Sequence, residues 1–175
     1  MGLAGPIVKA VSQAGRWHDL GKLDPRFQRW LDPDAESVGP LAKSGLAPDR
    51  AQVARGASGW PRGGRHELLS ARLVAAWLPT NPVDFDTDLL LHLITSHHGH
   101  GRPLVLPVHD PAPARLRANI GGHDVTASGD LGSTDWEQPR RFRIVCERYG
   151  LWGTALLEAI VRQADHLVSN IAGVT

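Results

Sequence analysis

Residues 17–31 read WHDLGKLDPRFQRWL, and this stretch bears most directly on the fold. The residue before a proline is disfavoured in the α-helical region of backbone dihedral angles. The stretch therefore predicts two helical pieces that separate near Asp24-Pro25. Gly21, inside the first piece, is a poor helix former. It indicates either that another segment or a substrate approaches closely or that the helix is simply irregular.

Outward from this stretch, the sequence predicts several more helices. Residues 1–15 form a short helix that places Ile7, Val8 and Val11 on one face. Residues 66–78 carry apolar side chains at helical spacing, and Pro79 ends that helix. Residues 86–98 begin with acidic residues and are apolar almost all round, which is typical of a buried helix. Two further helices are predicted over residues 139–149 and 151–171.

Two stretches rich in glycine and proline interrupt the helices. Residues 32–65 predict a long loop or a mobile insertion. Residues 101–138 are predicted to be irregular too, except that ANIGGHDVTAS (118–128) contains a Gly-Gly turn signal and favours a small β-hairpin. We therefore expect a single all-α domain over residues 1–175, with long irregular loops and one small hairpin.

Composition places the chain among globular, soluble proteins. Of its 175 residues 42% are hydrophobic and 21% are charged, and a chain of this length can bury a sizeable core. Cys146 is the sole cysteine, so no disulfide can form within the chain and a reducing cytosol is expected. No apolar run approaches the roughly 20 residues that cross a bilayer, and the N-terminus is a poor signal peptide. These features predict a cytoplasmic protein without a membrane partner.

Charge does not by itself identify a binding partner. The net charge is +1, which gives no strong bulk attraction to nucleic acid. Arginines nevertheless gather in two groups, which either are solvated surface or contact a polyanion. The groups comprise Arg50, Arg55, Arg62 and Arg65, and Arg140, Arg141 and Arg143.

Metal-competent side chains lie on or at the ends of the predicted helices. Imidazoles together with carboxylates suit first-row transition metals better than a site made of oxygen alone. A carboxylate can bridge two ions, and two ions about 3.5–4 Å apart can activate water and stabilise the leaving oxygen of a phosphodiester. Lys22 follows His18 by one helical turn and could offset phosphate charge. The candidate ligands are His18, Asp19, His66, His97, His98 and Asp165.

Each of these residues also has a purely structural interpretation. His66 could simply begin a helix, and His97-His98 could end one, where cations meet the negative end of the helix dipole. Asp165, flanked by Ala164 and Leu167, would be costly to bury without a partner. His92 lies among leucines, and we expect a hydrogen-bonded core histidine there.

These residues match a known pattern. His18-Asp19-Leu20-Gly21-Lys22 has the HD-x-G-K form of the HD phosphohydrolase superfamily. The longer segments, spread from residue 17 to residue 170, resemble the HD nuclease domain of the type I CRISPR helicase–nuclease. They read HDLGKLDPRFQRWL, RHELLSA, SHHGHGRP and QADHLVS.

The resemblance implies an all-α HD-domain bundle around two divalent transition-metal ions (Mn, Fe, Ni or Co). His18, Asp19 and Asp165 would bind the first ion, with Asp19 bridging. His66, His97 and His98 would bind the second. Lys22 would support the phosphate or the attacking water, so that Asp19 and Lys22 are the expected catalytic residues. The implied reaction is hydrolysis of phosphodiester bonds in single-stranded DNA during CRISPR interference.

The chain departs from the family pattern upstream of His18. The family has another histidine ligand there, whereas no histidine precedes His18 in this sequence. Either the chain is truncated at its N-terminus or water or another residue takes that position, and we expect the first ion to be weakly bound. No G-x-x-x-x-G-K-[ST] motif occurs. The resemblance therefore implies a helicase on another chain or a missing portion, and through it a CRISPR RNA-guided complex.

Single-strand binding needs positive charge and stacking aromatic rings. Trp60 and Trp136 lie near arginines and are candidates, although core tryptophans are the alternative. The arginines predicted to bind nucleic acid are Arg62, Arg65, Arg102, Arg140 and Arg141. Two other functions share the metal ligands: a phosphohydrolase of nucleotides or small phosphoesters, which needs a closed pocket, and a catalytically silent metal-binding module that binds a partner protein.

Overall fold

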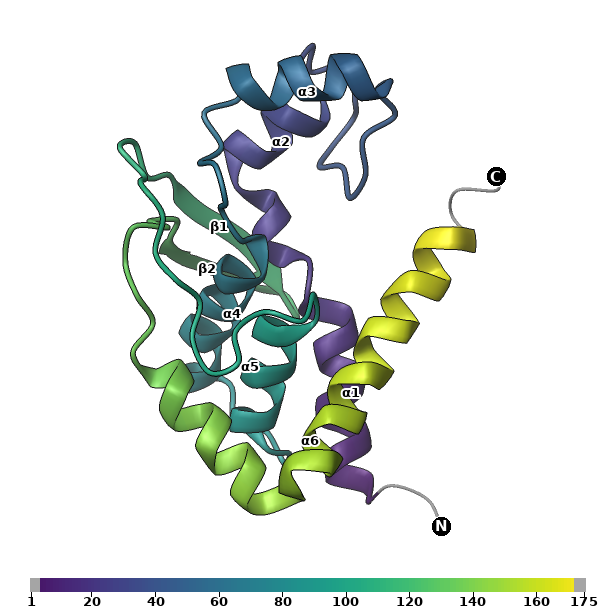
Figure 1. The fold of residues 1–175 in the computed structure, drawn as a ribbon, viewed down its shortest axis with the longest axis vertical. Helices are drawn as coiled ribbons and strands as arrows, with labels where there is room; N and C mark the ends of the chain where they lie inside the picture. Colours follow the sequence, from purple (N-terminus) through teal and green to yellow (C-terminus); the bar gives the residue numbers. More distant parts are fainter. Residues whose placement is uncertain (1–3, 172–175) are drawn as a thin grey trace. The chain divides into compact units, whose positions relative to one another are not determined.

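The computed structural model describes residues 4–171, which form helices and one β-hairpin (Figure 1). Two compact units are distinguished. Unit 1 comprises residues 4–18, 78–105 and 135–171, and unit 2 comprises residues 19–77 and 106–134. The predicted all-α class with a small hairpin is confirmed. No helix formed by the described residues combines the length and the apolar composition needed to span a bilayer.

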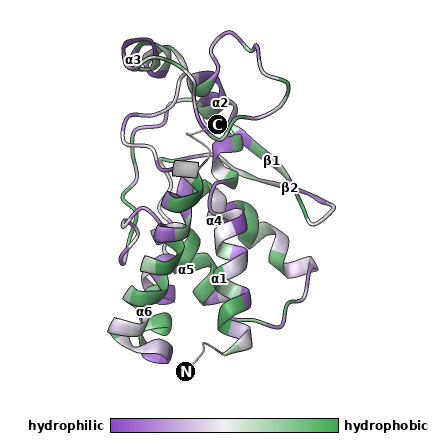
Figure 2. Ribbon diagram, turned by 90° about the vertical axis from the view of Figure 1, so that its right-hand side faces the viewer, coloured by the Kyte–Doolittle hydropathy of each residue, from purple (hydrophilic) through white to green (hydrophobic). Residues whose placement is uncertain are grey.

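Unit 1 contains three long helices that contact one another pairwise: α1 (Gly5–Trp17), α5 (Thr87–Ser96) and α6 (Glu137–Ile171), with a short 3-10 helix, η2 (Leu78–Thr80). Helix α5 is the core element, because every residue from 89 to 97 is buried. Figure 2 shows α5 coloured as predominantly hydrophobic. The prediction that residues 86–98 form a buried helix is confirmed, with Asp86 as its N-cap.

The buried face of α1 differs in part from the prediction. Ala10 and Ala14 are fully buried and Ile7 and Val11 are half-buried, whereas Val8 is 49% exposed. Alanines carry the buried stripe because a short side chain lets the helix contact α5 and α6 closely. Ile7 and Val11 therefore lie on the buried face with the two alanines, and Val8 is the residue that was placed wrongly.

Helix α6 is two helices joined at a kink. Gly150 has φ 72° and ψ 161°, a conformation outside the helical region that a side chain with Cβ rarely adopts. The separate helices predicted over residues 139–149 and 151–171 are thereby confirmed, although the first begins at Glu137.

A network of hydrogen bonds anchors the N-terminus of α5. The Asp86 carboxylate accepts from the Leu89 N–H at 3.1 Å, from Arg148 at 2.8 Å and from the Tyr149 hydroxyl at 2.8 Å. Burial raises the pKa of Asp86, but the hydrogen bonds from Arg148, Leu89 and Tyr149 outweigh it and leave the pKa below its ordinary value. Burial and the same carboxylate raise the pKa of Tyr149 to about 12.

Asp86→Asn keeps a capping side chain but loses the charge that binds Arg148 and Tyr149. We expect the variant to be less stable by about 1 kcal/mol at neutral pH. Because the folded-state pKa of Asp86 is depressed, the stabilisation is fully present above its unfolded pKa and is lost as pH falls through the folded value. Urea unfolding from pH 7 to pH 3 should therefore show the wild-type advantage shrinking below about pH 4.

The exposed Asp124 offers a control with the same charge change, Asp124→Asn. A constant free-energy difference between wild type and Asp86→Asn over this pH range would contradict the assigned role of the carboxylate.

Unit 2 contains η1 (Leu20–Leu23), α2 (Pro25–Leu31), α3 (Pro48–Ala57), α4 (His66–Trp77), β1 (Arg115–Ile120) and β2 (His123–Ser128). The strands are antiparallel, with Ile120 opposite His123 across a turn at Gly121-Gly122, where both glycines have positive φ. The hairpin contacts α4 and buries alternate residues of β1, which are Leu116, Ala118 and Ile120. The predicted hairpin is confirmed.

The predicted break at Asp24-Pro25 is confirmed, and its cause is an ion cluster as well as the proline. Asp24 is extended and accepts from the Arg26 N–H, which caps α2. The Arg26 guanidinium makes two bonds to Asp24, at 3.0 and 2.8 Å, and one to Asp110 at 2.7 Å. All three side chains are buried, so the cluster ties α2 to the loop before the hairpin.

The prediction that residues 32–65 form a long loop or a mobile insertion missed the helix α3, which lies within them. Pro48 occupies the first helical position and Asp49 the first turn, both of which favour helix initiation. Ala54 is buried, and α3 contacts α2. The helix was missed because the surrounding glycines indicate a loop and because α3 itself contains few hydrophobic residues.

Gly21 allows η1 to contact the backbone of α4. A Cβ on this glycine would lie 2.0 Å from the carbonyl oxygen of His66 and 2.8 Å from the Ser70 nitrogen. The Gly21 N–H donates to the Ser70 hydroxyl at 2.7 Å, and that hydroxyl donates to the His66 carbonyl at 3.1 Å. Of the two interpretations left open by the sequence, close approach of another segment is the one observed.

Gly21→Ala should force η1 away from α4, since the clash is with backbone that cannot rotate aside. We expect a loss of about 1–3 kcal/mol in the free energy of unfolding, measured by urea denaturation. Gly15→Ala is the matched control, because nothing lies within 4 Å of its Cβ position and alanine is the better helix former by up to about 1 kcal/mol. Equal stability of the two variants would refute the packing argument.

Candidate metal centre

In unit 1, His18 follows the last residue of α1 and faces α6. Its Nδ1 lies 2.8 Å from the Gly15 carbonyl oxygen, and because a carbonyl only accepts, Nδ1 carries the hydrogen. Its Nε2 lies 3.3 Å from Asp165 Oδ1. In a neutral imidazole Nε2 then presents a lone pair toward a carboxylate oxygen, so this pair is stabilised by a proton or a metal ion between them.

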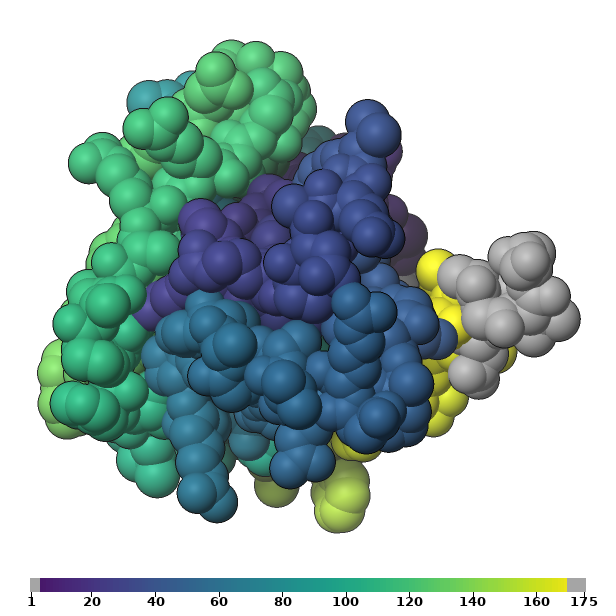
Figure 3. All heavy atoms as spheres, turned by 90° about the horizontal axis from the view of Figure 1, so that it is seen from above, coloured from purple at the N-terminus to yellow at the C-terminus, as the bar shows by residue number. Residues whose placement is uncertain are grey.

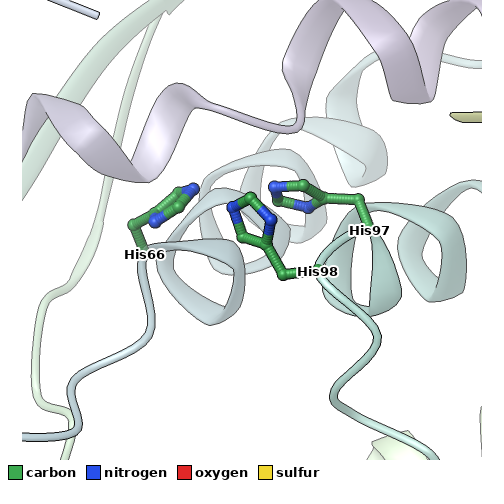
Figure 4. A group of neighbouring side chains, drawn as sticks. All are labelled: His66, His97 and His98. Carbon is green, nitrogen blue, oxygen red and sulfur yellow. The ribbon is translucent and has the colours of Figure 1, made fainter. Parts of the chain in front are cut away.

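His97 and His98 follow the last residue of α5. His97 is fully buried, and its Nδ1 donates to the Ile94 carbonyl at 2.7 Å, which leaves Nε2 as the candidate ligand nitrogen, as at His18. The ring centroids are 4.8 Å apart for His18 and His97, and 4.1 Å apart for His97 and His98. Figure 4 shows His97 and His98 extending from the same helix end, and it also labels His66.

Asp165 completes this group from the second half of α6. Its side chain is partly buried and also accepts from the Ser169 hydroxyl at 3.4 Å. The apolar surroundings expected for it are wrong, since Ala164 and Leu167 are exposed. Proximity to His18, rather than burial among apolar residues, is what makes Asp165 a candidate ligand.

Unit 2 holds a smaller group centred on Asp19. One carboxylate oxygen lies 3.0 Å from His66 Nε2, and the other accepts from Lys22 Nζ at 2.7 Å. Lys22 also donates to the Ala42 carbonyl at 3.2 Å. The predicted shared helix of His18 and Lys22 is wrong, because α1 ends at Trp17 and Lys22 lies in η1. Lys22 thus forms an ion pair with Asp19 across one turn of the 3-10 helix.

Two buried carboxylates that lie beside histidines were not among the residues that the sequence predicted. Glu67 is 1% exposed, with Oε2 3.6 Å from His66 Nδ1. Glu158 is buried and lies 2.6 Å from His92 Nε2. Glu158 precedes Asp165 by two helical turns, a spacing that could have indicated a shared polar face. The expectation that His92 is a hydrogen-bonded core histidine is confirmed.

Most arginines predicted to bind nucleic acid have acidic partners in the structure. Arg102 contacts Glu158 at 3.0 Å, Arg140 contacts Glu137 at 3.4 Å and Arg65 lies 3.8 Å from Glu67. Arg141 is buried and donates to Gln138 at 2.7 Å. Arg62 is exposed and lines an open pocket in unit 2.

The donors fit divalent transition metals. Unit 1 brings three imidazoles and one carboxylate together, and unit 2 brings one imidazole to one carboxylate, which is a nitrogen and oxygen set that suits Mn, Fe, Co, Ni or Zn. Backbone carbonyls orient two of the imidazoles, as is usual for metal-binding histidines.

An all-α domain with histidine and aspartate groups at its helix ends defines the class as a helical domain of the HD type. Residues 9–172 match the model of the Cas3 HD domain, and the chain belongs to that family. This confirms the resemblance seen in the sequence. The family is one of metal-dependent nucleases of CRISPR systems, and HD domains bind divalent metals. Searches among curated proteins and among solved structures gave no match.

Asp165→Ala should weaken binding of Mn²⁺ or Co²⁺ to the full chain by at least about tenfold, because it removes the carboxylate beside His18. Calorimetric titration of the metal-free protein measures this. His166→Ala, which changes an exposed neighbour on the same helix, should leave the affinity unchanged. Equal affinities for both variants would exclude Asp165 from the metal centre.

Proposed function

We propose that this chain is a nuclease that hydrolyses phosphodiester bonds of single-stranded DNA in CRISPR interference, and that residues 1–175 act as a single HD-type domain. The family match over nearly the whole chain supports this proposal. The observation that carries it is the orientation of His18 and His97, whose Nδ1–H groups bond to backbone carbonyls and turn both Nε2 atoms into candidate ligands.

The proposed ligands are the six residues singled out in the sequence. When bound, divalent ions would activate water and stabilise the leaving oxygen of the phosphodiester. The proposed assignment keeps two ions: His18, Asp19 and Asp165 for the first, and His66, His97 and His98 for the second.

Side chains next to the proposed ligands would orient them and balance the charge of the site. The contact between η1 and α4 places Asp19 beside His66, and Lys22 fixes the second oxygen of the Asp19 carboxylate. An ammonium group at this point also offsets the charge of a phosphate that approaches Asp19. The buried Glu67 carboxylate lies 3.6 Å from His66 Nδ1, so it adds negative charge beside an imidazole that would bind a cation.

The proposed nuclease needs a source of single-stranded DNA. The substrate would be unwound by a helicase on another chain or on a further portion of this one, within a CRISPR RNA-guided complex in the prokaryotic cytoplasm. Family membership supports this context.

Asp19→Ala should abolish cleavage of a labelled single-stranded DNA in the presence of Mn²⁺, Ni²⁺ or Co²⁺, because it removes a ligand that two ions would share. Circular dichroism establishes that the variant is folded. Asp124→Ala, an exposed residue of the hairpin, should cut at the wild-type rate. If folded Asp19→Ala retained that rate, the site would lie elsewhere; if a mononucleotide but no polynucleotide were hydrolysed, the enzyme would be a nucleotide phosphohydrolase.

A further inference from the structure

An open pocket of about 920 Å³ lies in unit 2, between α2, α3 and the loop that precedes α4. The lining includes Trp30, Trp60, Arg55 and Arg62, together with Gly56 and Gly63, where no side chain obstructs the opening. Both arginines are exposed. Of the residues that line it, none is acidic, so the pocket combines aromatic rings with uncompensated positive charge. In Figure 3, residues of α2 and α3, in purple and blue tones, form part of the surface that faces the viewer.

The aromatic wall is held in place from behind. The Phe27 ring lies 4.9 Å from both the Trp30 and the Trp60 rings, edge to face. Arg26, fixed by Asp24, lies 5.7 Å from the Trp60 ring. Arg29 donates twice to the Ser58 carbonyl, at 3.1 and 3.0 Å, which fastens the loop to α2. A preorganised wall of this kind loses little entropy when a ligand binds.

The polar wall is suited to a nucleotide. The Arg55 guanidinium carbon lies 4.7 Å from the centre of the Trp30 ring, and a base can stack on an arginine–aromatic pair. Arg62 lies on the same pocket and can bind a phosphate. A small hydrophobic ligand would leave both guanidinium groups without a counterion.

The pocket is joined to the proposed catalytic residues by one side chain. Phe27 contacts Trp30 and Trp60 on one side, and on the other its ring lies 5.5 Å from the ring of His66. A chain of nucleotides held in the pocket would therefore be anchored one aromatic ring away from a proposed metal ligand.

We propose that this pocket is a subsite for one nucleotide of a single-stranded DNA, whose base stacks on the Arg55–Trp30 pair while Arg62 binds a phosphate. The identity of the ligand rests on the proposed nuclease function. The subsite explains why Arg55 and Arg62 face solvent without an acidic residue in the pocket lining.

Binding without cleavage tests the subsite. Fluorescence anisotropy of the metal-free chain (residues 1–175) with a labelled oligothymidylate of about 12 nucleotides measures affinity at several salt concentrations. Arg55→Gln with Arg62→Gln should weaken binding by at least about fivefold and reduce the salt slope by about 0.7, because Arg62 contacts one phosphate and Arg55 stacks on a base. Trp30→Leu should weaken binding by at least about fivefold while leaving the slope unchanged.

Two controls match these changes. Arg143→Gln and Trp152→Leu alter exposed residues of unit 1 and should bind as wild type does. The wild type should bind an oligonucleotide with abasic positions more weakly than it binds the intact strand. Trp30→Leu should bind the two oligonucleotides with equal affinity. All variants should retain the wild-type metal affinity, which a general loss of structure would change.

The outcomes separate this subsite from the nuclease proposal. Pocket variants that bind with wild-type affinity and salt slope overturn the subsite, and the nuclease proposal survives if the wild type still cuts. A wild type that binds through the pocket but cuts with none of the metals refutes the nuclease and upholds the subsite. A wild type that binds no single-stranded DNA overturns the subsite as well.

Discussion

The contact between Gly21 and the first turn of α4 is the constraint on which unit 2 depends. The backbone of η1 lies against the His66 carbonyl so closely that no side chain fits between them. This contact sets the position of Asp19, two residues before Gly21, relative to the His66 imidazole. Lys22, one residue after Gly21, donates a hydrogen bond to the same carboxylate. A helix-breaking residue thus has a packing role that also aligns chemical groups, which explains why HD and GK occur together in one short motif.

In unit 1, hydrogen bonds at helix ends, rather than a glycine contact, set the orientation of the histidines. His18 and His97 both follow the ends of helices, where carbonyl groups of the last turn lack partners within the helix. Each histidine uses Nδ1 to satisfy one of these carbonyls, three residues back along the chain. The interaction that ends each helix therefore also orients a proposed metal ligand. The structural interpretation of His97 as a helix-end residue and its interpretation as a ligand are not alternatives, because the first provides the geometry for the second.

Prediction from the sequence succeeded where a pattern is local. The proline at 25, the Gly-Gly turn and the apolar run before His97 each specify their structure with few residues, and the structure agrees. It failed where long-range contacts decide. Nothing local shows that Ala10 and Ala14, rather than Val8, form the buried face of α1, or that α3 lies within a glycine-rich stretch. The pairing of Arg102 with Glu158 and the burial of Glu67 likewise depend on segments distant in the chain. The six candidate ligands were found from their chemistry and from the family resemblance, and their assignment to particular ions stays a proposal.

The buried cluster of Asp24, Arg26 and Asp110 has a consequence for how ionic strength acts on this protein. Mobile ions screen charges that water surrounds, whereas they reach a buried pair far less. The exposed pair between Arg50 and Asp34 weakens as salt is added, but the cluster that fastens α2 keeps its strength. Contacts between exposed arginines and a phosphate backbone are lost in the same salt range. The fold of unit 2 and its attraction for a polyanion thus respond to different parts of the environment, so that a bound strand can be released by salt alone from a protein that stays folded.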